Sequence, residues 1–521
     1  LTNSGRVQGD SGLTLTLLNA LTNQTSGVLL SQNVSALSAP VLTNDGTIQG
    51  NGKTTLSAAT QAHNSGKILS GGELTFTTPD YSGSGWLQAT DLLLNVAKLA
   101  GNGTVMAANQ ATLTGNSLTN RGLFQAAQLN VNTQTITNSG TLLGNQGLTI
   151  KGNSLNNAGG KVFSGGDMLA DMVSLSGAGQ LVALGNLTLK LTRGLTAQGV
   201  IAANKQLSVS SQGDITNGAT LQGNGITLNA AGRLTNNGQL TAGNGTTALS
   251  GSGIAMNASG SLQAGGDVSL TSRGDITLDG FTGTTGSLML TAAGSVINTA
   301  LLYAGNNLSL FASTIRNHHG DMLAGDSLVM QKDVSGAANA EVINTSGNIE
   351  TTRGDITIRT GHLLNQREGI NETKSYIPVE NVAVPDGANS VSVRVGDLGE
   401  DGWGYYVKSW SGTAGGGFEA WAVPTEKGAT RKFLTGTTRV DVGATGGDAR
   451  ISAGNNLLID ADKLDNTGSH LLASEFVSLS GSQLNNQSFF GYTQDEYNVY
   501  RYYGKLAMIP NDGHLQYGDA S

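Results

Sequence analysis

The chain of 521 residues contains no cysteine, and this absence excludes several kinds of chemistry. Disulfide bonds, cysteine-ligated metal sites and cysteine nucleophiles are all ruled out. Proline is rare, with 6 residues, and aromatic residues make up only 5% of the chain. Charged residues make up 12% and hydrophobic residues 38%. This is not the composition of a disordered chain, because disorder requires much charge and little apolar content.

The charges that are present form no cluster of one sign. The net charge is −8, and no run of Lys and Arg is available to neutralise phosphates, so we expect no nucleic-acid partner. No stretch approaches the roughly 18 consecutive apolar residues of a transmembrane helix. The first residues lack the basic and apolar regions of a signal peptide. They begin in the middle of a repeated phrase, which predicts that the chain is a fragment of something longer.

Glycine and asparagine, in contrast, are abundant and recur in a regular pattern. Gly accounts for 76 residues, without the three-residue period of collagen. The pattern aliphatic-x-Asn returns mostly every 18 to 21 residues where copies are adjacent. Its copies are Leu1/Asn3, Leu21/Asn23, Leu42/Asn44, Leu118/Asn120, Ile136/Asn138, Leu155/Asn157, Ile215/Asn217, Leu234/Asn236, Val296/Asn298, Ile315/Asn317, Val342/Asn344 and Leu363/Asn365.

The repeated unit has the pattern of short strands joined by tight turns. Phrases such as "NSGTLLG" at 138–144 are followed by alternating segments such as "LTI" at 148–150. Alternation predicts strands with one buried face, and Gly and Asn suit the turns. A period of about 20 residues then predicts an all-β fold, a right-handed parallel β-helix with one repeat per coil, whose asparagines stack as an amide ladder. Leucine-rich repeats have a similar period, but they need helical segments that are missing here.

The repeat breaks after residue 370. Residues 371–444 hold three of the six prolines and three of the four tryptophans. Their strand-like runs are separated by "GDLGEDG" and "SGTAGGG", which predict hairpin loops, so we expect a small antiparallel β module inserted in the β-helix. The repeat phrase resumes over 445–488, and the Tyr-rich segment 489–521 contains six of the eleven tyrosines. The predicted domains are therefore 1–370, 371–444, 445–488 and 489–521.

The repeat phrases resemble those of filamentous haemagglutinin-repeat exoproteins, which Gram-negative bacteria export by two-partner secretion. The resemblance covers nearly all of 1–370 and 445–486 and rests on the phrases N-x-G-x-Φ-x-A-G and Φ-x-L, where Φ is aliphatic. A stick interrupted by an aromatic module and followed by Tyr-rich sequence looks most like the stick and receptor-binding region of a CdiA-type contact-dependent growth inhibition effector. The chain departs from the full-length pattern at both ends, because it has no recognisable secretion domain and no toxin.

The resemblance implies a secreted protein on the cell surface of a Gram-negative bacterium. It also implies an outer-membrane secretion partner for export. The distal part would recognise an outer-membrane protein or lipopolysaccharide of a target bacterium before toxin delivery, and we expect a monomer. The alternative is a haemagglutinin-type adhesin that binds a host glycan or protein, since adhesins share these repeats.

Motifs that resemble chemical sites have simpler explanations in this chain. "GGD" at 265–267 occurs once, whereas calcium-binding nonapeptides need tandem copies. Asp214, Asp275 and Asp355 recur in "GDI", where a turn carboxylate precedes an inward Ile. His318 and His319 are adjacent, so their side chains are expected to point apart, and no Cys or further His completes a metal site. We expect no enzyme activity, no cofactor and no metal; a polysaccharide-degrading β-helix would need clustered acids, and here they are scattered.

The aromatic insertion is the best candidate for partner binding. In "WGYYVKSW" at 403–410 alternate residues share a face, so aromatic side chains lie on both faces. One face can form the core of the module while the other remains available, and exposed Trp and Tyr are enriched at binding hot spots. The C-terminal tyrosines could bind as well, cap the open end of the β-helix, or begin the family's Tyr-rich segment. The candidate receptor-binding residues are Trp403, Tyr405, Tyr406, Trp410, Phe418, Trp421, Tyr497, Tyr500, Tyr502 and Tyr503.

Overall fold

The computed structural model describes the chain except for residues 387–388, 396–406, 413–414, 421–429, 502–506, 509–514 and 517–521. Its contacts divide the chain into two compact units. The first unit comprises residues 1–366 and 448–486, and we call it the solenoid. The second comprises residues 367–447 and 487–521. Among the described residues, no helix is long and apolar enough to cross a membrane.

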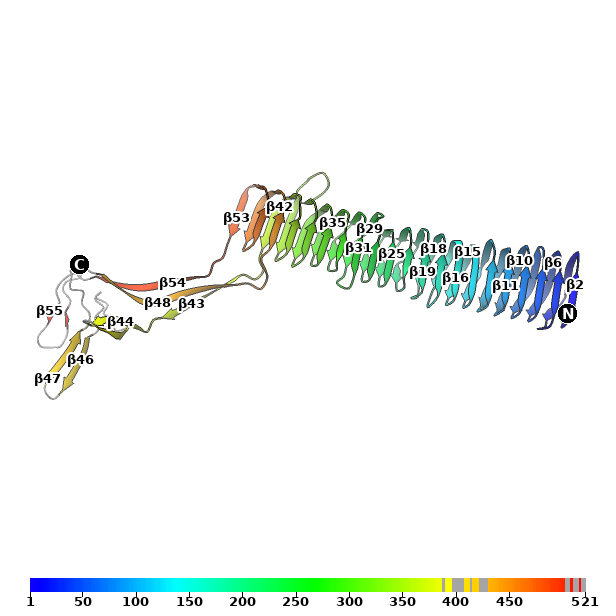
Figure 1. Ribbon diagram of the computed structural model, residues 1–521, viewed down its shortest axis with the longest axis horizontal. Helices are drawn as coiled ribbons and strands as arrows, with labels where there is room; N and C mark the ends of the chain where they lie inside the picture. The colour runs from blue at the N-terminus through cyan, green and yellow to red at the C-terminus, as the bar shows by residue number, and fades with distance from the viewer. Residues whose placement is uncertain are drawn as a thin grey trace. The chain divides into compact units, whose positions relative to one another are not determined.

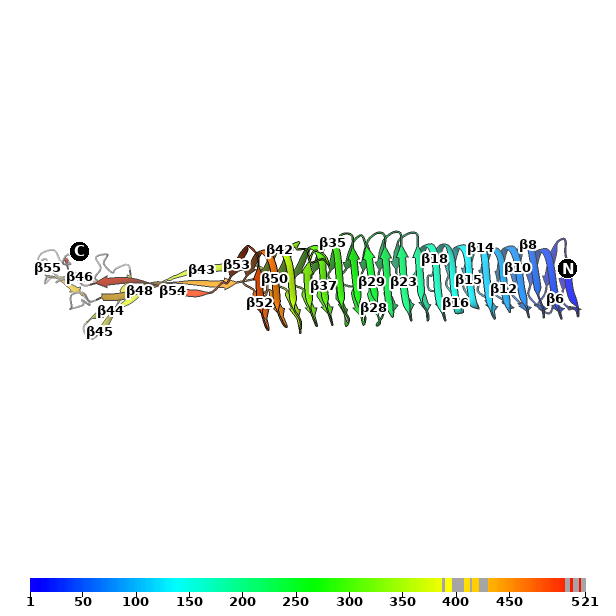
Figure 2. The ribbon, with the colours of Figure 1, turned by 90° about the horizontal axis from the view of Figure 1, so that it is seen from above.

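The solenoid is a parallel β-helix, as the repeat predicts. Its coils follow one another for about 22 turns in a single 47-stranded sheet (Figures 1 and 2). Strands one coil apart pair residue for residue: β5 (Val28–Ser31) pairs with β7 (Thr47–Gly50), and β7 pairs with β9 (Lys67–Ser70). Each coil therefore supplies both neighbours with hydrogen-bond partners along its whole length.

The core of the solenoid consists of columns of inward aliphatic side chains. In β9, Ile68 and Ser70 are buried while the alternate residues face outward. Leu29, Ile48, Ile68 and Leu87 follow one another in register along one column, and each is at most 1% exposed. Burying such a side chain contributes about 1.5–3 kcal/mol. A single coil has no second layer to pack against, so stacking on neighbours is what makes each coil stable.

The asparagines of the repeat form the predicted amide ladder, inside the core. Asn23, Asn44 and Asn64 are 0% exposed. From Asn3 to Asn64, each Nδ2 donates to Oδ1 of the asparagine in the next coil at 2.8 Å. The second proton of the amide is directed to backbone carbonyls, such as that of Gly27, 3.1 Å from Asn23 Nδ2. The phrase "LTN" thus contributes both an inward aliphatic residue and a buried, hydrogen-bonded amide.

The ladder is interrupted where the repeat has lost its asparagine. Small or apolar residues take those register positions: Gly83, Gly101, Ala197, Met256 and Leu278. At the first interruption, Asn64 Nδ2 lies 3.4 Å from the hydroxyl oxygen of Tyr81 and donates to it. Tyr81 is 4% exposed and packs edge to face on Phe76, with ring centroids 5.5 Å apart. A phenol therefore replaces the missing amide acceptor.

The chain leaves the solenoid and returns to it without disturbing the stack. β42 (Ile356–Gln366) precedes the excursion, and β49 (Arg450–Ala453) and β50 (Leu457–Thr467) follow it. β42 pairs in parallel with β50 from Ile356 to Gln366, and Asn365 Nδ2 donates to Asn466 Oδ1 at 2.8 Å. The two coils stack as if they were consecutive in sequence.

The second unit contains the antiparallel structure predicted for the insertion. Its main sheet, which we call the ribbon, has the order β43 (Asn371–Pro378), β48 (Thr430–Gly443) and β54 (Tyr492–Arg501). Two hairpins pair β44 (Asn381–Asp386) with β45 (Asn389–Arg394), and β46 (Val407–Gly412) with β47 (Gly415–Ala420). A short pair joins β55 (Ala507–Met508) to β56 (Leu515–Gln516). The second hairpin spans "SGTAGGG"; the loop predicted at "GDLGEDG" lies outside the described residues, and β45 pairs with the strand before it.

Candidate functional site

The ribbon differs from the solenoid because its strands have almost no covered face. All eight side chains of β43 are exposed. Among the ribbon side chains that the structure describes, the buried ones lie in the central strand, where Phe433, Thr438 and Val440 are 5–7% exposed. A three-stranded sheet normally gains its stability from a packed hydrophobic face. The described side chains of the flanking strands β43 and β54 are therefore exposed on both sides of the sheet.

A close approach at Gly436 holds one aromatic ring on the ribbon. A Cβ atom at Gly436 would lie 2.1 Å from the hydroxyl oxygen of Tyr376, so a larger residue would displace the ring. The Tyr376 hydroxyl donates to the carbonyl oxygen of Thr435 at 3.4 Å. Tyr376 thus covers a glycine of the neighbouring strand while half of its surface, 50%, remains exposed.

Large apolar side chains gather on the two flanking strands. We call this set the aromatic surface: Tyr376, Ile377, Tyr492, Tyr497 and Val499, which are 49–57% exposed. It spans both faces of the ribbon, because Tyr376 and Ile377 are adjacent in β43 and point to opposite sides. Polar groups accompany them, since Asp495 accepts hydrogen bonds from Thr437 Oγ1 at 2.7 Å and from the Tyr497 hydroxyl at 3.4 Å. Tyrosine combines a large apolar area with a polar group and loses little conformational freedom, which suits it to partner binding.

Tyr497 is the one predicted receptor-binding residue whose side chain the structure describes. It lies in β54, paired with Leu434 of β48. The backbone of Tyr500 pairs with that of Arg431, and in the second hairpin Trp410 pairs with Gly417 and Phe418 with Ser409. The remaining candidates, Trp403, Tyr405, Tyr406, Trp421, Tyr502 and Tyr503, lie outside the described residues. Their role in binding stays a prediction.

Sequence reasoning missed four members of the aromatic surface: Tyr376, Ile377, Tyr492 and Val499. The segment "NETKSYIP" at 371–378 carries no tryptophan and a single tyrosine, so its composition does not mark it as a binding element. The missing information was pairing, because β43 and β54 both pair with β48 although they are far apart in sequence. The composition of a segment does not indicate which distant strands pair with it.

The aspartates of the "GDI" phrases have a structural role, as predicted. Each precedes an isoleucine that is 0% exposed, namely Ile215, Ile276 and Ile356. Each carboxylate accepts a backbone N–H from the turn of the next coil: Asp214 from Arg233 at 2.8 Å, Asp275 from Ser295 at 2.7 Å and Asp355 from Asn456 at 2.9 Å. The aspartate of "GGD", Asp267, accepts from Ser287 in the same way at 2.8 Å. These acids fasten one turn to the next.

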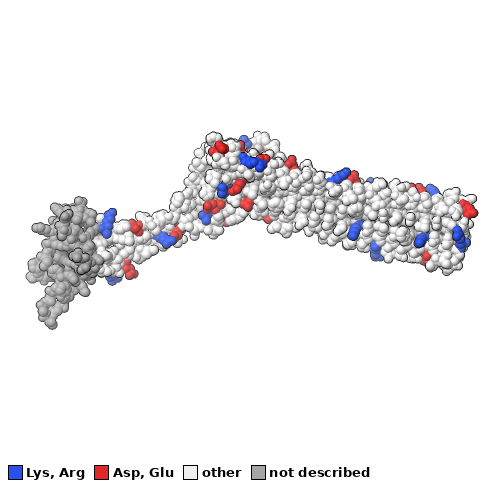
Figure 3. All heavy atoms as spheres, viewed as in Figure 1, with Lys and Arg blue, Asp and Glu red and all other residues white. Residues whose placement is uncertain are grey.

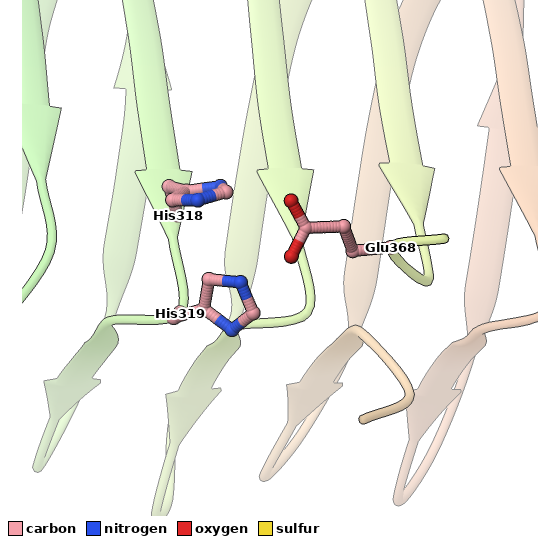
Figure 4. A group of neighbouring side chains, drawn as sticks. All are labelled: His318, His319 and Glu368. Atoms are coloured by element: carbon pink, nitrogen blue, oxygen red, sulfur yellow. The ribbon is translucent and has the colours of Figure 1, made fainter. Parts of the chain in front are cut away.

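The adjacent histidines do not point apart, contrary to prediction. His318 ends β37 (Leu308–His318), and His319 follows it with a φ angle of 55°, which is uncommon for a residue other than glycine. This turn brings the two rings edge to face, with centroids 4.4 Å apart (Figure 4). Glu368, also labelled in Figure 4, belongs to the second unit. Two imidazoles by themselves supply half of the four ligands of a structural zinc site.

Charged side chains are few and scattered over the face of the solenoid seen in Figure 3. One row of charged residues joins the coils before and after the insertion. His362 Nε2 lies 2.8 Å from Asp465 Oδ2, and its Nδ1 lies 3.3 Å from Glu341 Oε1. Lys463 Nζ is 2.7 Å from Asp465 Oδ2. The hydrogen bond from Lys463, with a smaller contribution from His362, holds the pKa of Asp465 below its ordinary value.

The side of the solenoid also carries a shallow hollow of about 460 Å³. Outward apolar side chains form its floor, with Phe163 in register between Leu143 and Val182. Polar residues surround them: Thr141, Asn145, Lys161 and Gln180. The volume lies within the range of about 300–1,000 Å³ that is typical of ligand sites. Its residues include no pair of acids that could act on a substrate.

Comparison with known proteins identifies the repeat. The family model described as haemagglutinin repeat matches residues 1–77, 82–127, 124–190, 182–251, 226–280, 283–375 and 433–498. No solved structure matches the chain.

Several curated relatives are similar over most of the chain. It is 99% identical over 521 residues to a tRNA nuclease CdiA of Escherichia coli strain STEC_O31, which is all of this chain and 16% of that relative. It is 46% identical over 496 residues to a tRNA nuclease CdiA of Escherichia coli O6:K15:H31 strain 536, covering 92% of this chain and 15% of the relative. A deoxyribonuclease CdiA of Dickeya dadantii strain 3937 is 36% identical over 513 residues, covering 96% and 15%. The chain thus spans only about 15–16% of the length of these relatives.

Proposed function

Because this chain belongs to the haemagglutinin-repeat family, we propose that it is a non-enzymatic part of a cell-surface stick that presents a receptor-binding region. In this proposal an outer-membrane secretion partner exports the protein to the surface of a Gram-negative bacterium. The second unit then recognises an outer-membrane protein or lipopolysaccharide of a neighbouring bacterium. This contact serves the delivery of a toxin that lies elsewhere in the longer protein. The nuclease activities in the names of the relatives are not proposed for this part.

The aromatic surface of the ribbon is the observation that carries the proposal. In the solenoid, the turn aspartates bind backbone groups and most large apolar residues fill the core, with exposed exceptions such as Leu18 and Phe476. In the ribbon, Tyr376, Ile377 and Tyr497 remain about half exposed. Covering the exposed half of such side chains with a partner contributes roughly 0.7–1.5 kcal/mol each. The difference between a repetitive solenoid and a non-repetitive ribbon supports a division between a spacer and a binding element.

Binding to whole cells tests this proposal. We expect the labelled full chain to bind susceptible target bacteria and their outer-membrane vesicles. The triple variant Tyr376→Ser, Ile377→Ser, Tyr497→Ser should lose at least tenfold in affinity, since several half-exposed contacts are removed together. A matched control is Trp86→Ser, Tyr303→Ser, which removes aromatic side chains that are 45% and 38% exposed on the solenoid.

Two results would contradict the assignment of the site. The first is unchanged binding by the triple variant and by a chain lacking residues 371–444. The second is loss of binding in the solenoid control alone. Circular dichroism of each variant shows whether the strands are retained, so that a folding defect is not taken for a binding defect.

The runner-up function is an adhesin for a host glycan or protein. The hollow around Phe163 favours it, because an apolar floor with a polar rim suits a small sugar or peptide segment. In that case Phe163→Ser would abolish binding to host cells, and bacterial outer-membrane vesicles would not compete.

A further inference from the structure

The edge of strand β43 is regular and unoccupied by any described strand. β43 pairs with β48 on one side, from Asn371 to Pro378, without a shift in register. The N–H of Val379 donates to the carbonyl of Thr435 at 3.0 Å. The antiparallel alternation then directs the backbone groups of odd-numbered residues in β43 towards β48 and those of even-numbered residues outward. A regular exposed edge of this kind is a template for a further strand.

The opposite edge of the ribbon is less suited to pairing. The pairing of β48 with β54 shifts in register between Leu434 and Gly436. Asp495 and Glu496, two adjacent acids, lie in β54 beside this shift. Irregular pairing and like charges are features that protect an edge strand from association. β43 is therefore the edge of the ribbon at which a new strand would be added.

The side chains of β43 indicate which strand that would be. Glu372 and Lys374 are both exposed, lie on the same face two residues apart, and form no ion pair with a described residue. If two copies of β43 pair in antiparallel fashion about an axis at Thr373, Glu372 of each copy faces Lys374 of the other. The same register places Ile370 opposite Tyr376. Opposite charges and aromatic–β-branched pairs are both favourable when they face each other across two strands.

We propose that β43 pairs with β43 of a second copy of this chain, joining two molecules through their ribbons about a two-fold axis. The interface is isologous, so the one pair of opposite charges in β43, Glu372 and Lys374, gives two ion pairs in the dimer. An unrelated strand could use the same backbone groups. A second copy of β43, however, always brings a lysine opposite Glu372 and a glutamate opposite Lys374 in this register. The contact is short, and a weak, concentration-dependent dimer is expected in place of the monomer that the sequence suggested.

Charge exchange tests the register on the full chain. Sedimentation velocity over a range of concentrations should show a monomer–dimer equilibrium. Glu372→Lys and Lys374→Glu should each raise the dissociation constant about tenfold, because two attractive pairs become repulsive. The double exchange Glu372→Lys, Lys374→Glu should restore the dimer. Lys205→Glu on the solenoid, which changes net charge as Lys374→Glu does, should have no effect.

The absence of native cysteine allows a second test. Thr373 would face itself across the axis as a non-hydrogen-bonded pair, whose Cα atoms lie about 4.5 Å apart. This separation permits a disulfide. Thr373→Cys should therefore form a covalent dimer on mild oxidation, whereas Thr493→Cys on the opposite edge should remain monomeric.

Three outcomes would overturn the proposal. The full chain could stay monomeric at the highest concentration, with equally slow disulfide formation in both cysteine variants. The double charge exchange could fail to restore the dimer, which would exclude the register. Finally, the charge reversals could weaken binding to outer-membrane vesicles while sedimentation stayed monomeric, which would assign the edge to a foreign strand. Because sedimentation and disulfide formation use the purified chain alone, their failure is distinguishable from failure of the receptor-binding function.

Discussion

The amide ladder leads to a prediction about Asn44. Its Nδ2 donates to Asn64 Oδ1 at 2.8 Å, and its Oδ1 accepts from Asn23 Nδ2 at 2.8 Å. Nδ2 is also within 3.2 Å of the carbonyl oxygen of Gly46. The variant Asn44→Ala removes these bonds and leaves Asn64 Oδ1 without a donor inside the core.

The expected loss of stability follows from these contacts. Leaving a buried polar group without its partner costs about 1–3 kcal/mol, and two ladder bonds are lost. The remaining bond of Asn23 Nδ2 to the Gly27 carbonyl reduces the cost on that side. We expect Asn44→Ala to destabilise the surrounding coils by about 3–4 kcal/mol. Asn44→Asp should cost more at neutral pH, because it places a carboxylate against an acceptor oxygen in the core.

Hydrogen exchange is the appropriate assay, because coils interact mainly with their neighbours and open locally. Protection in residues 20–70 should fall by about 150- to 900-fold, since each 1.4 kcal/mol is about tenfold, while that of residues beyond 200 should be unchanged. The control is Gln49→Ala, which removes an exposed amide pair, Gln49 Nε2 to Asn51 Oδ1 at 3.0 Å. A loss below about 1 kcal/mol, or an equal loss of protection along the whole solenoid, would refute the reasoning.

Three further predictions concern single positions. Burial raises the pKa of Tyr81 to about 12, so the folded protein retains a proton that the unfolded chain releases above about pH 10. The free energy of unfolding should therefore fall by about 2–3 kcal/mol between pH 10 and 12. Urea titrations should show that Tyr81→Phe removes this fall. Lys463 lowers the pKa of Asp465, so the contribution of this carboxylate to stability is present above about pH 4 and is lost as the pH falls further. Asp465→Asn should therefore weaken the dependence of the free energy of unfolding on pH below about pH 4, measured by urea titration. A Cβ at Gly66 would lie 2.0 Å from the Gly46 carbonyl oxygen, so Gly66→Ala should lower the free energy of unfolding by about 1–3 kcal/mol, the usual cost of overpacking. A Cβ at Gly5 would have nothing within 4 Å, so Gly5→Ala should leave thermal unfolding unchanged.

The solenoid could be predicted from the sequence because its information is local. The inward leucine and the asparagine two residues later occur within one short phrase, as at Leu21 and Asn23. Each coil then meets a copy of the same phrase in the next coil, so the pattern also specifies the contact. Tyr81 shows the limit of this logic. Its role as the acceptor for Asn64 depends on the absence of an asparagine at Gly83, one coil further on.

The ribbon could be predicted as antiparallel but not assembled from the sequence. Its strands have the usual alternation, yet β48 pairs with β43 at one end of the insertion and with β54 beyond the resumed coils. Such pairings depend on loop closure over long stretches and leave no local pattern. The aromatic residues chosen from composition therefore included Tyr497 and omitted Tyr376, whose position is defined by Gly436 of the neighbouring strand.

The hydrogen bonds of the amide ladder all run in the same direction along the solenoid. Wherever two of its asparagines follow each other, Nδ2 of the earlier coil donates to Oδ1 of the later one, from Asn3 to Asn23 at the beginning and from Asn466 to Asn486 at the end. The side-chain dipoles are therefore aligned, and hydrogen bonds arranged in series polarise one another. To continue the ladder, a coil added before the first would offer a donor, and a coil added after the last would offer an acceptor. The solenoid is thus a polar filament whose two ends are chemically different, although its repeat looks the same throughout.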